Sequence, residues 1–534
     1  MTEQEKKAKR KNITLIFVTL MVTMLLASLS QMIFSSALPT IVGELNGVDH
    51  MAWVITAYML ASTILMPVYG KVSDLLGRKP LLIGAISLFI IGSIVGAMAQ
   101  SMNILILARV IQGLGGGGLM ILSQAAVADV IPARQRGKYM GIMGGVFALS
   151  SVAGPLLGGW LTEGAGWRWA FLLNIPLGVL ALVAVITLMH LPKFARESRP
   201  KLDYSGMAIL AATTTSIILA TTWGGSTYAW DSIQIIGLFA GAIIGAVAFV
   251  INELKASEPI IPMSLFKEKN FILTTTAAMF ISMAMFGVVG YMPTYFQMAV
   301  GASASKAGLF MAPMMGAMLL TSIVSGAVVS KTGKYKFFPI AGTMVLATGL
   351  WLLSTISLDT PVAMICAYMA VVGMGLGASM QILTLIVQNT FVHKLVGTAT
   401  AANNYFRQVG ASFGTAIVGS IFATNLARIL SEKFPNGMSG GAGMDSLTPT
   451  LLASLPDAIR LPIVEAYNGA LIPIFTYLIP LALAASLVLM FVKEKPLAEE
   501  VEDEIVAESL AEGQLTVTEL DDDESDRATK TVSV

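Results

Sequence analysis

A short charged segment lies between two long apolar runs near the start of the sequence. It reads Gly70-Lys-Val-Ser-Asp-Leu-Leu-Gly-Arg-Lys-Pro80, and we expect a loop at the protein surface there. Its glycines permit a close approach of helices, and Asp74 can accept hydrogen bonds from Arg78 or from the N–H groups that open a neighbouring helix. Such a cluster can latch two helix bundles together in one state and release them in another, whereas the alternative is a basic loop that only sets topology. The residues of the predicted latch are Gly70, Asp74, Gly77, Arg78 and Lys79.

Arg109 is a cation inside a long apolar run, 103 to 126. If that run crosses a membrane, the cation costs roughly 2.5 to 3.5 kcal/mol and normally faces a partner or a water-filled cavity. Gln112 shares its helix face at a spacing of three residues. The alternative is that Arg109 snorkels to a lipid headgroup. Arg407 beside Asn404 is in a similar position, and there both interpretations stay open.

The run from 138 to 161 carries small residues at steps of four and three. A stripe of this kind lets another helix approach closely, although plain packing explains it as well. Pro155 should bend the segment because proline lacks a backbone N–H. The members of the stripe are Gly144, Ala148, Ser151, Pro155 and Gly158.

The elements that must position these residues are membrane spans. Of the 534 residues, 55% are hydrophobic and 12% are charged, whereas a soluble domain carries about 25% charged residues. This composition excludes a water-soluble enzyme. A span needs about 20 mostly apolar residues. The fourteen runs of that kind are 13–38, 51–70, 81–100, 103–126, 138–161, 169–191, 206–224, 233–252, 271–296, 307–329, 337–356, 361–388, 398–425 and 470–492.

Lysine and arginine divide unequally between the two sets of connecting segments. One side collects 26 of them, including those of the basic N-tail (1–12), and the other side collects five. By the positive-inside rule, both tails are predicted to be cytoplasmic and the loop 428–469 to be external. The acidic tail (493–534) is predicted to be disordered. A single cysteine, Cys366, excludes a disulfide framework.

Glycine spacings recur between the two halves of the chain. The pair Gly70 and Gly77 recurs 256 residues later, and the row Gly113, Gly115, Gly117 recurs 260 residues later. Internal repeats of this kind are typical of secondary transporters. We therefore predict an all-α integral membrane protein with two six-helix bundles as pseudo-repeats, 13–191 and 271–492. Two additional helices, within 206–252, lie between them.

Three motifs resemble those of the major facilitator superfamily. Gly70 to Lys79 resembles its cytoplasmic signature, Arg109-Val-Ile-Gln-Gly-Leu-Gly resembles its helix 4 motif, and Gly154-Pro155 with Gly158-Gly159 resembles its helix 5 antiporter motif. Together with the fourteen spans, the stretches 167–178 and 301–308 look like those of the drug:H+ antiporter subfamily with fourteen helices. The resemblance covers residues 13 to 492.

The resemblance implies roles for these residues. Arg109 and Gln112 would take part in proton coupling. The helix 5 motif, Gly154, Pro155, Gly158 and Gly159, would seal the two halves against leak. The residues expected to line a substrate cavity are Ser30, Gln31, Phe34, Tyr58, Tyr291, Tyr295, Gln381, Asn404 and Arg407.

One position departs from the subfamily pattern, which usually has an aspartate where this chain has Ser30. No other acidic residue is central in a predicted span, since Glu44, Asp129 and Glu253 lie at or beyond helix ends. A carboxylate in a desolvated cavity is the natural proton carrier and cation partner. We therefore expect coupling to run elsewhere or otherwise, and neutral amphiphiles to be handled at least as well as permanent cations.

The expected function is secondary export of hydrophobic or amphiphilic compounds across the plasma membrane, by alternating access and proton antiport. A lipid or endogenous-metabolite exporter with non-standard or no proton coupling is an alternative, and a membrane enzyme or sensor is the contrasting class. The expected partners are a small amphiphilic substrate, membrane lipid and protons, with no nucleic acid. We expect a monomer without cofactor or metal, and the proton gradient as energy source.

Overall fold

The computed structural model describes residues 3–45, 50–189, 202–434, 452 and 455–499. Fourteen helical stretches among these residues are long and apolar enough to cross a membrane, which confirms the predicted all-α fold. The helices are α1 (Glu3–Leu45), α2 (Met51–Leu76), α3 (Arg78–Ala97), α4 (Met102–Val130), α5 (Ala133–Glu163), α6 (Trp169–Leu172), α7 (Asn174–Leu188), α8 (Tyr204–Trp223), α9 (Ile233–Glu253), η2 (Met263–Lys267), α10 (Lys269–Met298), α11 (Ala304–Phe310), α12 (Ala312–Thr332), α13 (Phe337–Ser354), α14 (Val362–Gln388), η3 (His393–Leu395), α15 (Val396–Lys433), α17 (Asp457–Leu471) and α18 (Ile474–Met490).

The helices extend further than the apolar runs that predict them. The segment 70–80 was expected to be a loop, but α2 continues to Leu76 and α3 begins at Arg78. Gly77 alone separates them, with φ at 90°, a backbone conformation that favours glycine. Similarly, α15 runs to Lys433 and α17 begins at Asp457, so both helices enter the predicted external loop.

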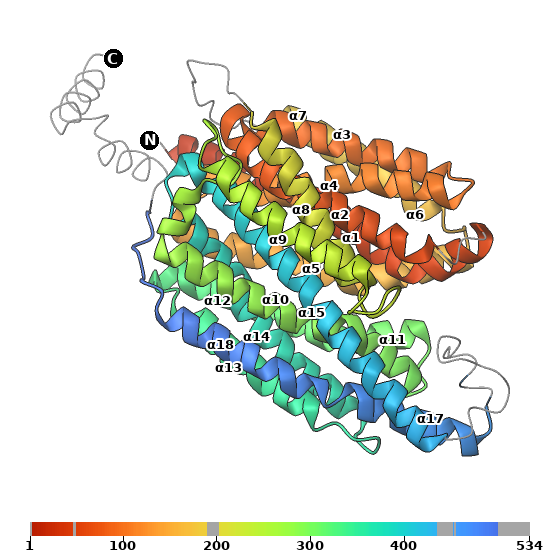
Figure 1. Cartoon of the computed structure of the whole chain (residues 1–534). Coiled ribbons are helices and arrows are strands. Elements are labelled where there is room, and N and C mark those ends of the chain that lie inside the picture. The colour runs from red at the N-terminus through yellow and green to blue at the C-terminus, as the bar shows by residue number, and fades with distance from the viewer. Residues whose placement is uncertain (1–2, 46–49, 190–201, 435–451, 453–454, 500–534) are drawn as a thin grey trace, which may run out of the picture.

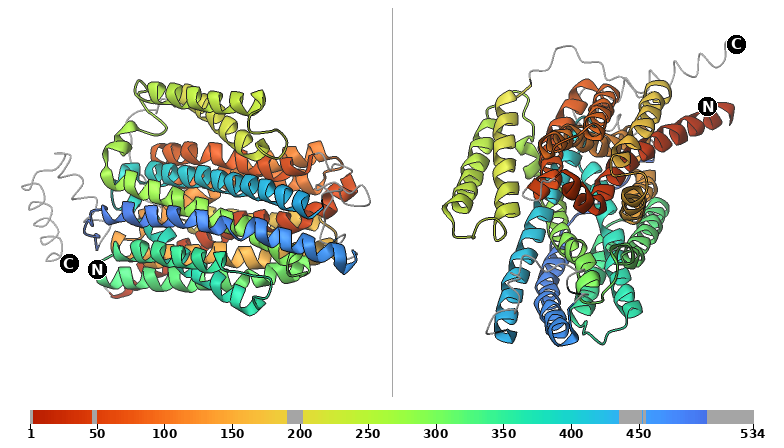
Figure 2. Two further views of the ribbon diagram at one scale, coloured as in Figure 1. Left: turned by 60° about the horizontal axis from the view of Figure 1, so that its bottom comes forward. Right: turned by 90° about the vertical axis from the view of Figure 1, so that its right-hand side faces the viewer.

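The bundle consists of two groups of helices with a separate pair beside them (Figure 1). We call α1–α7 the N half and α10–α18 the C half. Helices α8 and α9 form a hairpin on the outside, which the right-hand view of Figure 2 shows standing apart from the rest. The hairpin contacts both halves: Trp53 of α2 packs on Trp223, and Tyr405 of α15 shares a hydrogen bond of 2.9 Å with Thr214.

The glycine rows pack equivalent helices together in each half. A Cβ on Gly113 or Gly117 of α4 would collide with the backbone of α2, and one on Gly115 would collide with α3. In the C half, Gly373 and Gly377 of α14 meet α12 in the same way, and Gly375 meets α13. The contacted pairs also repeat, since Tyr58 and Ser62 of α2 correspond to Met314 and Met318 of α12. The spacing of 256 and 260 residues therefore reflects two copies of one packing pattern.

We call the end of the bundle where α2 meets α3 the tail end. The segment 491–499 lies there, because the side chain of Arg134, at the start of α5, forms an ion pair of 3.2 Å with Glu499. The N–H of Arg134 also donates to the carbonyl of Ala498 over 2.9 Å. The two halves are in close contact at this end: a Cβ on Gly141 of α5 would collide with the backbone of Ser322 on α12, and Gly326 of α12 would collide with α5 in turn.

Candidate functional site

A central cavity lies between the two halves and holds about 1220 Å³ of empty space, its open mouth included. Both halves contribute side chains to it. Nine methionines form most of the apolar lining together with Phe147 and Phe286. The methionines are Met24, Met32, Met59, Met66, Met120, Met143, Met285, Met318 and Met380. Thioether chains are flexible and polarizable, so a wall of this kind can repack around different apolar ligands.

Five of the nine predicted cavity residues line this space. They are Gln31, Tyr58, Gln381, Asn404 and Arg407. These polar groups are accompanied by Gln124 and Gln408, which the sequence reasoning did not place in the cavity. The cavity therefore combines a flexible apolar wall with a small set of amides around one cation.

The other four predicted cavity residues lie outside the described lining. Ser30 is buried between α1 and α7, where its hydroxyl accepts a hydrogen bond of 3.1 Å from Asn174. Phe34 is buried against Phe171. Tyr291 donates to the carbonyl of Thr415, and Tyr295 donates to the side chain of Asn468 on α17. These four side chains therefore contact other parts of the protein and not the described cavity lining.

Arg407 is the one permanently charged side chain among the described residues that line the cavity. Its guanidinium donates to the side-chain amide oxygen of Asn404 over 3.2 Å, while Nε finds no hydrogen-bond acceptor in the described part of the chain. Asn404 in turn donates to Gln124 of α4 over 3.0 Å, so that the pair bridges the two halves. The backbone carbonyl of Gln124 accepts a further bond from Gln388 of α14.

Arg109 does not snorkel to the membrane surface, because it is 1% exposed inside the N half. It donates to Gln112 over 2.8 Å and to the carbonyl of Val54 over 3.2 Å. Its guanidinium also lies over the rings of Tyr58 and Phe34, at 4.2 and 4.6 Å from their centroids. Tyr58 therefore lies between Arg109 and the cavity.

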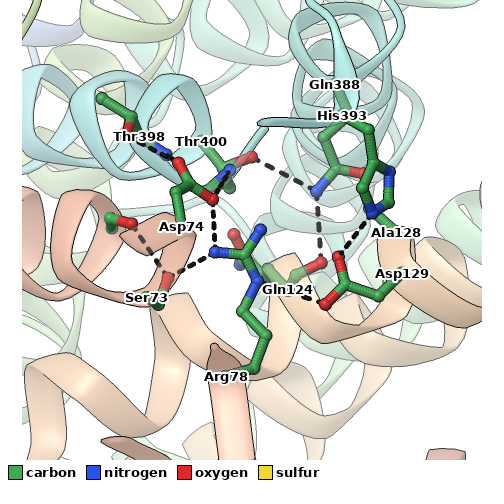
Figure 3. Close-up of polar contacts among 12 residues, drawn as sticks. Ser73, Asp74, Arg78, Gln124, Ala128, Asp129, Gln388, His393, Thr398 and Thr400 are labelled. Carbon is green, nitrogen blue, oxygen red and sulfur yellow. Dashed lines mark hydrogen bonds and ion pairs between the residues drawn. The ribbon is translucent and has the colours of Figure 1, made fainter. Parts of the chain in front are cut away.

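The predicted latch is a buried cluster that joins the two halves at the tail end (Figure 3). Asp74 forms an ion pair with Arg78. It also accepts hydrogen bonds from the N–H of Gly397 over 3.1 Å and from both the N–H and the hydroxyl of Thr398 over 2.6 Å. These donors open α15, so the predicted contact with a helix N-terminus is found. The expected surface position is wrong, since the side chains of Asp74 and Arg78 are 4% and 5% exposed.

Two residues of the latch were missed by the sequence reasoning. Asp129, in the last turn of α4, pairs with Arg78 over 3.3 Å and with His393 over 3.2 Å. Because His393 belongs to the C half, this contact forms a second bridge beside Asp74 (Figure 3). All of these side chains are at least nine-tenths buried. Breaking a buried pair by removing one partner is costly, so these contacts join the two halves in this structure.

The remaining predicted latch residues have different surroundings. A Cβ on Gly70 would collide with Ala401 of α15, which confirms a close approach between the halves at that point. Lys79 points away from the cluster and donates to the carbonyl of Ile186 over 2.8 Å. Lys71, between them, pairs with Glu258 beyond α9 over 2.7 Å and so ties the outer hairpin to the N half.

The helix 5 motif is only partly at the interface between the halves. Pro155 faces the C half, where its Cβ lies 3.6 Å from the position of a Cβ on Gly308. Gly154 instead packs on Met32 of α1. Gly158 is buried, and its carbonyl accepts a hydrogen bond from the hydroxyl of Thr162. A Cβ on Gly159 would meet open space. The tightest contacts of α5 with the C half lie nearer the tail end, around Gly141.

The acidic residues near helix ends are held away from the cavity. Glu44 accepts from Arg168 over 2.5 Å and from the indole N–H of Trp167 over 2.8 Å. These two hydrogen bonds, and chiefly the one from Arg168, hold the pKa of the Glu44 carboxyl below its ordinary value. Glu253 is buried at the end of α9 and accepts from the N–H of Ile261.

Comparison with known proteins agrees with this architecture. The family model of the Major Facilitator Superfamily matches residues 20–415. An uncharacterized MFS-type transporter of Mycobacterium tuberculosis is 38% identical, over 94% of this chain and 72% of its own. The multidrug transporter protein MdtP of Bacillus subtilis is 37% identical, over 89% of both chains. The solved structure of the proton:xylose symporter XylE has the same fold, with a TM-score of 0.59 at 16% identity, over 93% of this chain and 99% of that one. The chain is therefore a membrane transporter and not an enzyme, and it belongs to the major facilitator superfamily.

Proposed function

We propose that this transporter exports hydrophobic or amphiphilic compounds by alternating access, driven by proton antiport. The observation that carries the proposal is a methionine-lined cavity between two halves that are latched together at one end. The relative MdtP, named as a multidrug transporter, supports the choice of substrates.

Alternating access requires an end that can shut and open again. The tail end is shut by contacts that cross between the halves, including those of Asp74 with α15 and of Asp129 with His393. These contacts are polar and break as separate bonds, whereas a wide apolar interface would resist separation. Opening at the tail end, with closure at the opposite end around Pro155, would turn the cavity toward the other side of the membrane.

Proton coupling needs a group that gains a proton in one state and loses it in the other. In the described part of the chain no carboxylate lines the cavity, while Asp74 and Asp129 are buried in the latch. A proton on Asp129 would remove the negative charge that contacts Arg78 and His393. Proton binding and opening of the tail end are therefore linked, which is what antiport demands.

The orientation follows from the distribution of basic residues. The tail end should face the cytoplasm of a cell whose plasma membrane holds the transporter. An epitope placed after residue 534 should be reached by antibody only in permeabilised cells, and one inserted within 435–451 should be reached in intact cells. The opposite labelling pattern would reverse the direction assigned to transport.

The direct test is transport by purified protein in liposomes with an imposed pH gradient, with the membrane potential clamped by potassium and valinomycin. Antiport predicts that an amphiphilic fluorescent substrate accumulates on the acidic side, and that nigericin abolishes the accumulation. Asp129→Asn should still equilibrate the substrate but should no longer concentrate it. Accumulation on the alkaline side would indicate symport, and accumulation that ignores the gradient would refute proton coupling. A lipid as the sole transported compound would favour the alternative function.

A further inference from the structure

We propose that the central cavity selects amphiphiles that carry an anionic head group, and that Arg407 binds this group. The inference rests on the proposed export function and names its substrate class. It differs from the expectation raised by Ser30, which was a mere lack of preference for cations. The present inference instead depends on a group that is present, the guanidinium of Arg407 on the cavity wall.

The charge balance of the cavity is the first argument. Among the described residues that line it, Arg407 is a permanent cation, and aspartate and glutamate do not occur. Three carboxylates on helices that line the cavity are engaged elsewhere, Asp74 and Asp129 in the latch and Glu44 with Arg168. A ligand in the cavity therefore meets a net positive lining.

The state of Arg407 is the second argument. Its one described hydrogen bond goes to the neutral amide of Asn404, and Nε is buried without an acceptor. Arg407 is half-buried within a membrane span, and a cation in such a position is costly without an anionic partner. A ligand carboxylate or sulfonate would supply the missing acceptor, and the planar fork of arginine binds such groups through two parallel hydrogen bonds.

The distribution of lining groups is the third argument, because three amide side chains are gathered near Arg407. Asn404 and Gln408 lie within one turn of Arg407 on α15, and Gln124 is bonded to Asn404 from α4. Methionines from both halves, with Phe147 and Phe286, supply the apolar remainder. An anionic head among these amides, with an aromatic body against the thioethers, fits this lining.

The opposite charge should be disfavoured in the same site. A cationic amphiphile would place its charge beside a fixed guanidinium, in a cavity whose described lining residues offer amide oxygens but no carboxylate. Like charges repel more strongly in a desolvated site than in water. The expected order of affinity is therefore anion, then neutral compound, then cation.

The test is equilibrium binding of three probes that share one apolar body: 1-pyrenebutyrate, 1-pyrenebutanol and 4-(1-pyrenyl)butyl-trimethylammonium. Titration calorimetry of the full-length protein in detergent, with empty micelles as blank, gives each dissociation constant. The butyrate should bind about ten- to hundredfold more tightly than the alcohol, and the ammonium compound should bind most weakly. Arg407→Gln should abolish the preference and Arg407→Lys should restore part of it. Arg428→Gln is the matched control, since Arg428 is an exposed arginine on the same helix, paired with Glu432.

A second variant keeps the inference falsifiable if Arg407→Gln fails to fold. Gln381→Glu adds a negative charge to the same cavity and should shift the order of affinity toward the cation. Tightest binding of the ammonium compound by the unmodified protein would overturn the inference and leave the proposed export function standing. An unchanged anion preference in Arg407→Gln would overturn the assignment of Arg407. Binding of none of the three probes would overturn the proposed function itself and the inference with it.

Discussion

Thr398→Val should open the tail end, because it removes one bond that joins the two halves there. The Thr398 hydroxyl donates to Asp74 over 2.6 Å, and the side chain is 1% exposed. Valine has nearly the same shape but no hydroxyl. The backbone N–H groups of Gly397 and Thr398 still hold Asp74 in the variant, so the change deletes a single contact from the latch.

The size of the effect follows from the charge on the acceptor. A hydrogen bond to a charged group contributes about 1.5 to 3 kcal/mol. Asp74 belongs to α2 and Thr398 to α15, so the bond is lost when the halves separate and its whole free energy favours the closed tail end. Since about 1.4 kcal/mol is a factor of ten in an equilibrium constant, the ratio of tail-open to tail-closed protein should rise about ten- to hundredfold. Thr398→Ser keeps the donor and should stay close to the unmodified protein.

Electron–electron double resonance in lipid nanodiscs can measure this ratio. Leu76 and Lys334 are exposed residues at the tail end of opposite halves and lie outside the latch, so cysteines there can carry the spin labels. The background is Cys366→Ser, which removes the single native cysteine. Longer distances should gain population in Thr398→Val and not in Thr398→Ser. Equal distance distributions in the unmodified protein and both variants would refute the role of this bond in closure.

Three further predictions concern packing, the buried arginine and pH. Gly141→Ala should lower transport strongly, because the added Cβ would press on the backbone of α12. In Gly84→Ala the added Cβ meets open space, so this control should transport normally. Substrate flux into liposomes that contain each variant compares the two. Arg109→Lys should weaken substrate binding roughly threefold by loosening the contact with Tyr58, and an unchanged dissociation constant would show that Tyr58 is positioned without Arg109. Because folding lowers the pKa of Glu44, the ionised carboxyl stabilises the folded protein fully above pH 4.5, and this stabilisation is lost as pH falls through the lowered pKa. Glu44→Gln should remove this pH dependence from unfolding temperatures measured between acidic and neutral pH.

The spans and their repeat can be predicted from the sequence because each depends on local information. A window of about 20 apolar residues identifies a span whatever it packs against, and the glycine rows mark the close helix contacts that both halves make. The face of a helix is harder to predict in a membrane, since the side toward lipid and the side toward protein are both apolar. Ser30 and Gln31 illustrate this: they are neighbours on α1, yet Ser30 bonds to Asn174 and Gln31 lines the cavity.

The missed half of the latch has a related cause. His393 was one of three histidines scattered along the sequence, and Asp129 was one acid at a helix end. No spacing rule connects two residues that lie 264 positions apart, because only the packing of the two halves brings them within 3.2 Å. The pairing of Asp74 with Arg78 could be predicted because it is local, at a spacing of four residues across the break at Gly77.

The cavity and the latch share the same two helices, which gives a physical route from ligand binding to opening. On α4, Gln124 lines the cavity and Asp129 pairs with His393 five residues later. On α15, Thr398 holds Asp74 six residues before Asn404, which lines the cavity and bonds to Gln124. A ligand that forms a hydrogen bond to Gln124 or Asn404 in place of the bond between them removes one contact between the halves next to the latch. Because a helix transmits such a change along its axis as a rigid element, ligand binding should weaken closure at the tail end without touching any charged residue of the latch.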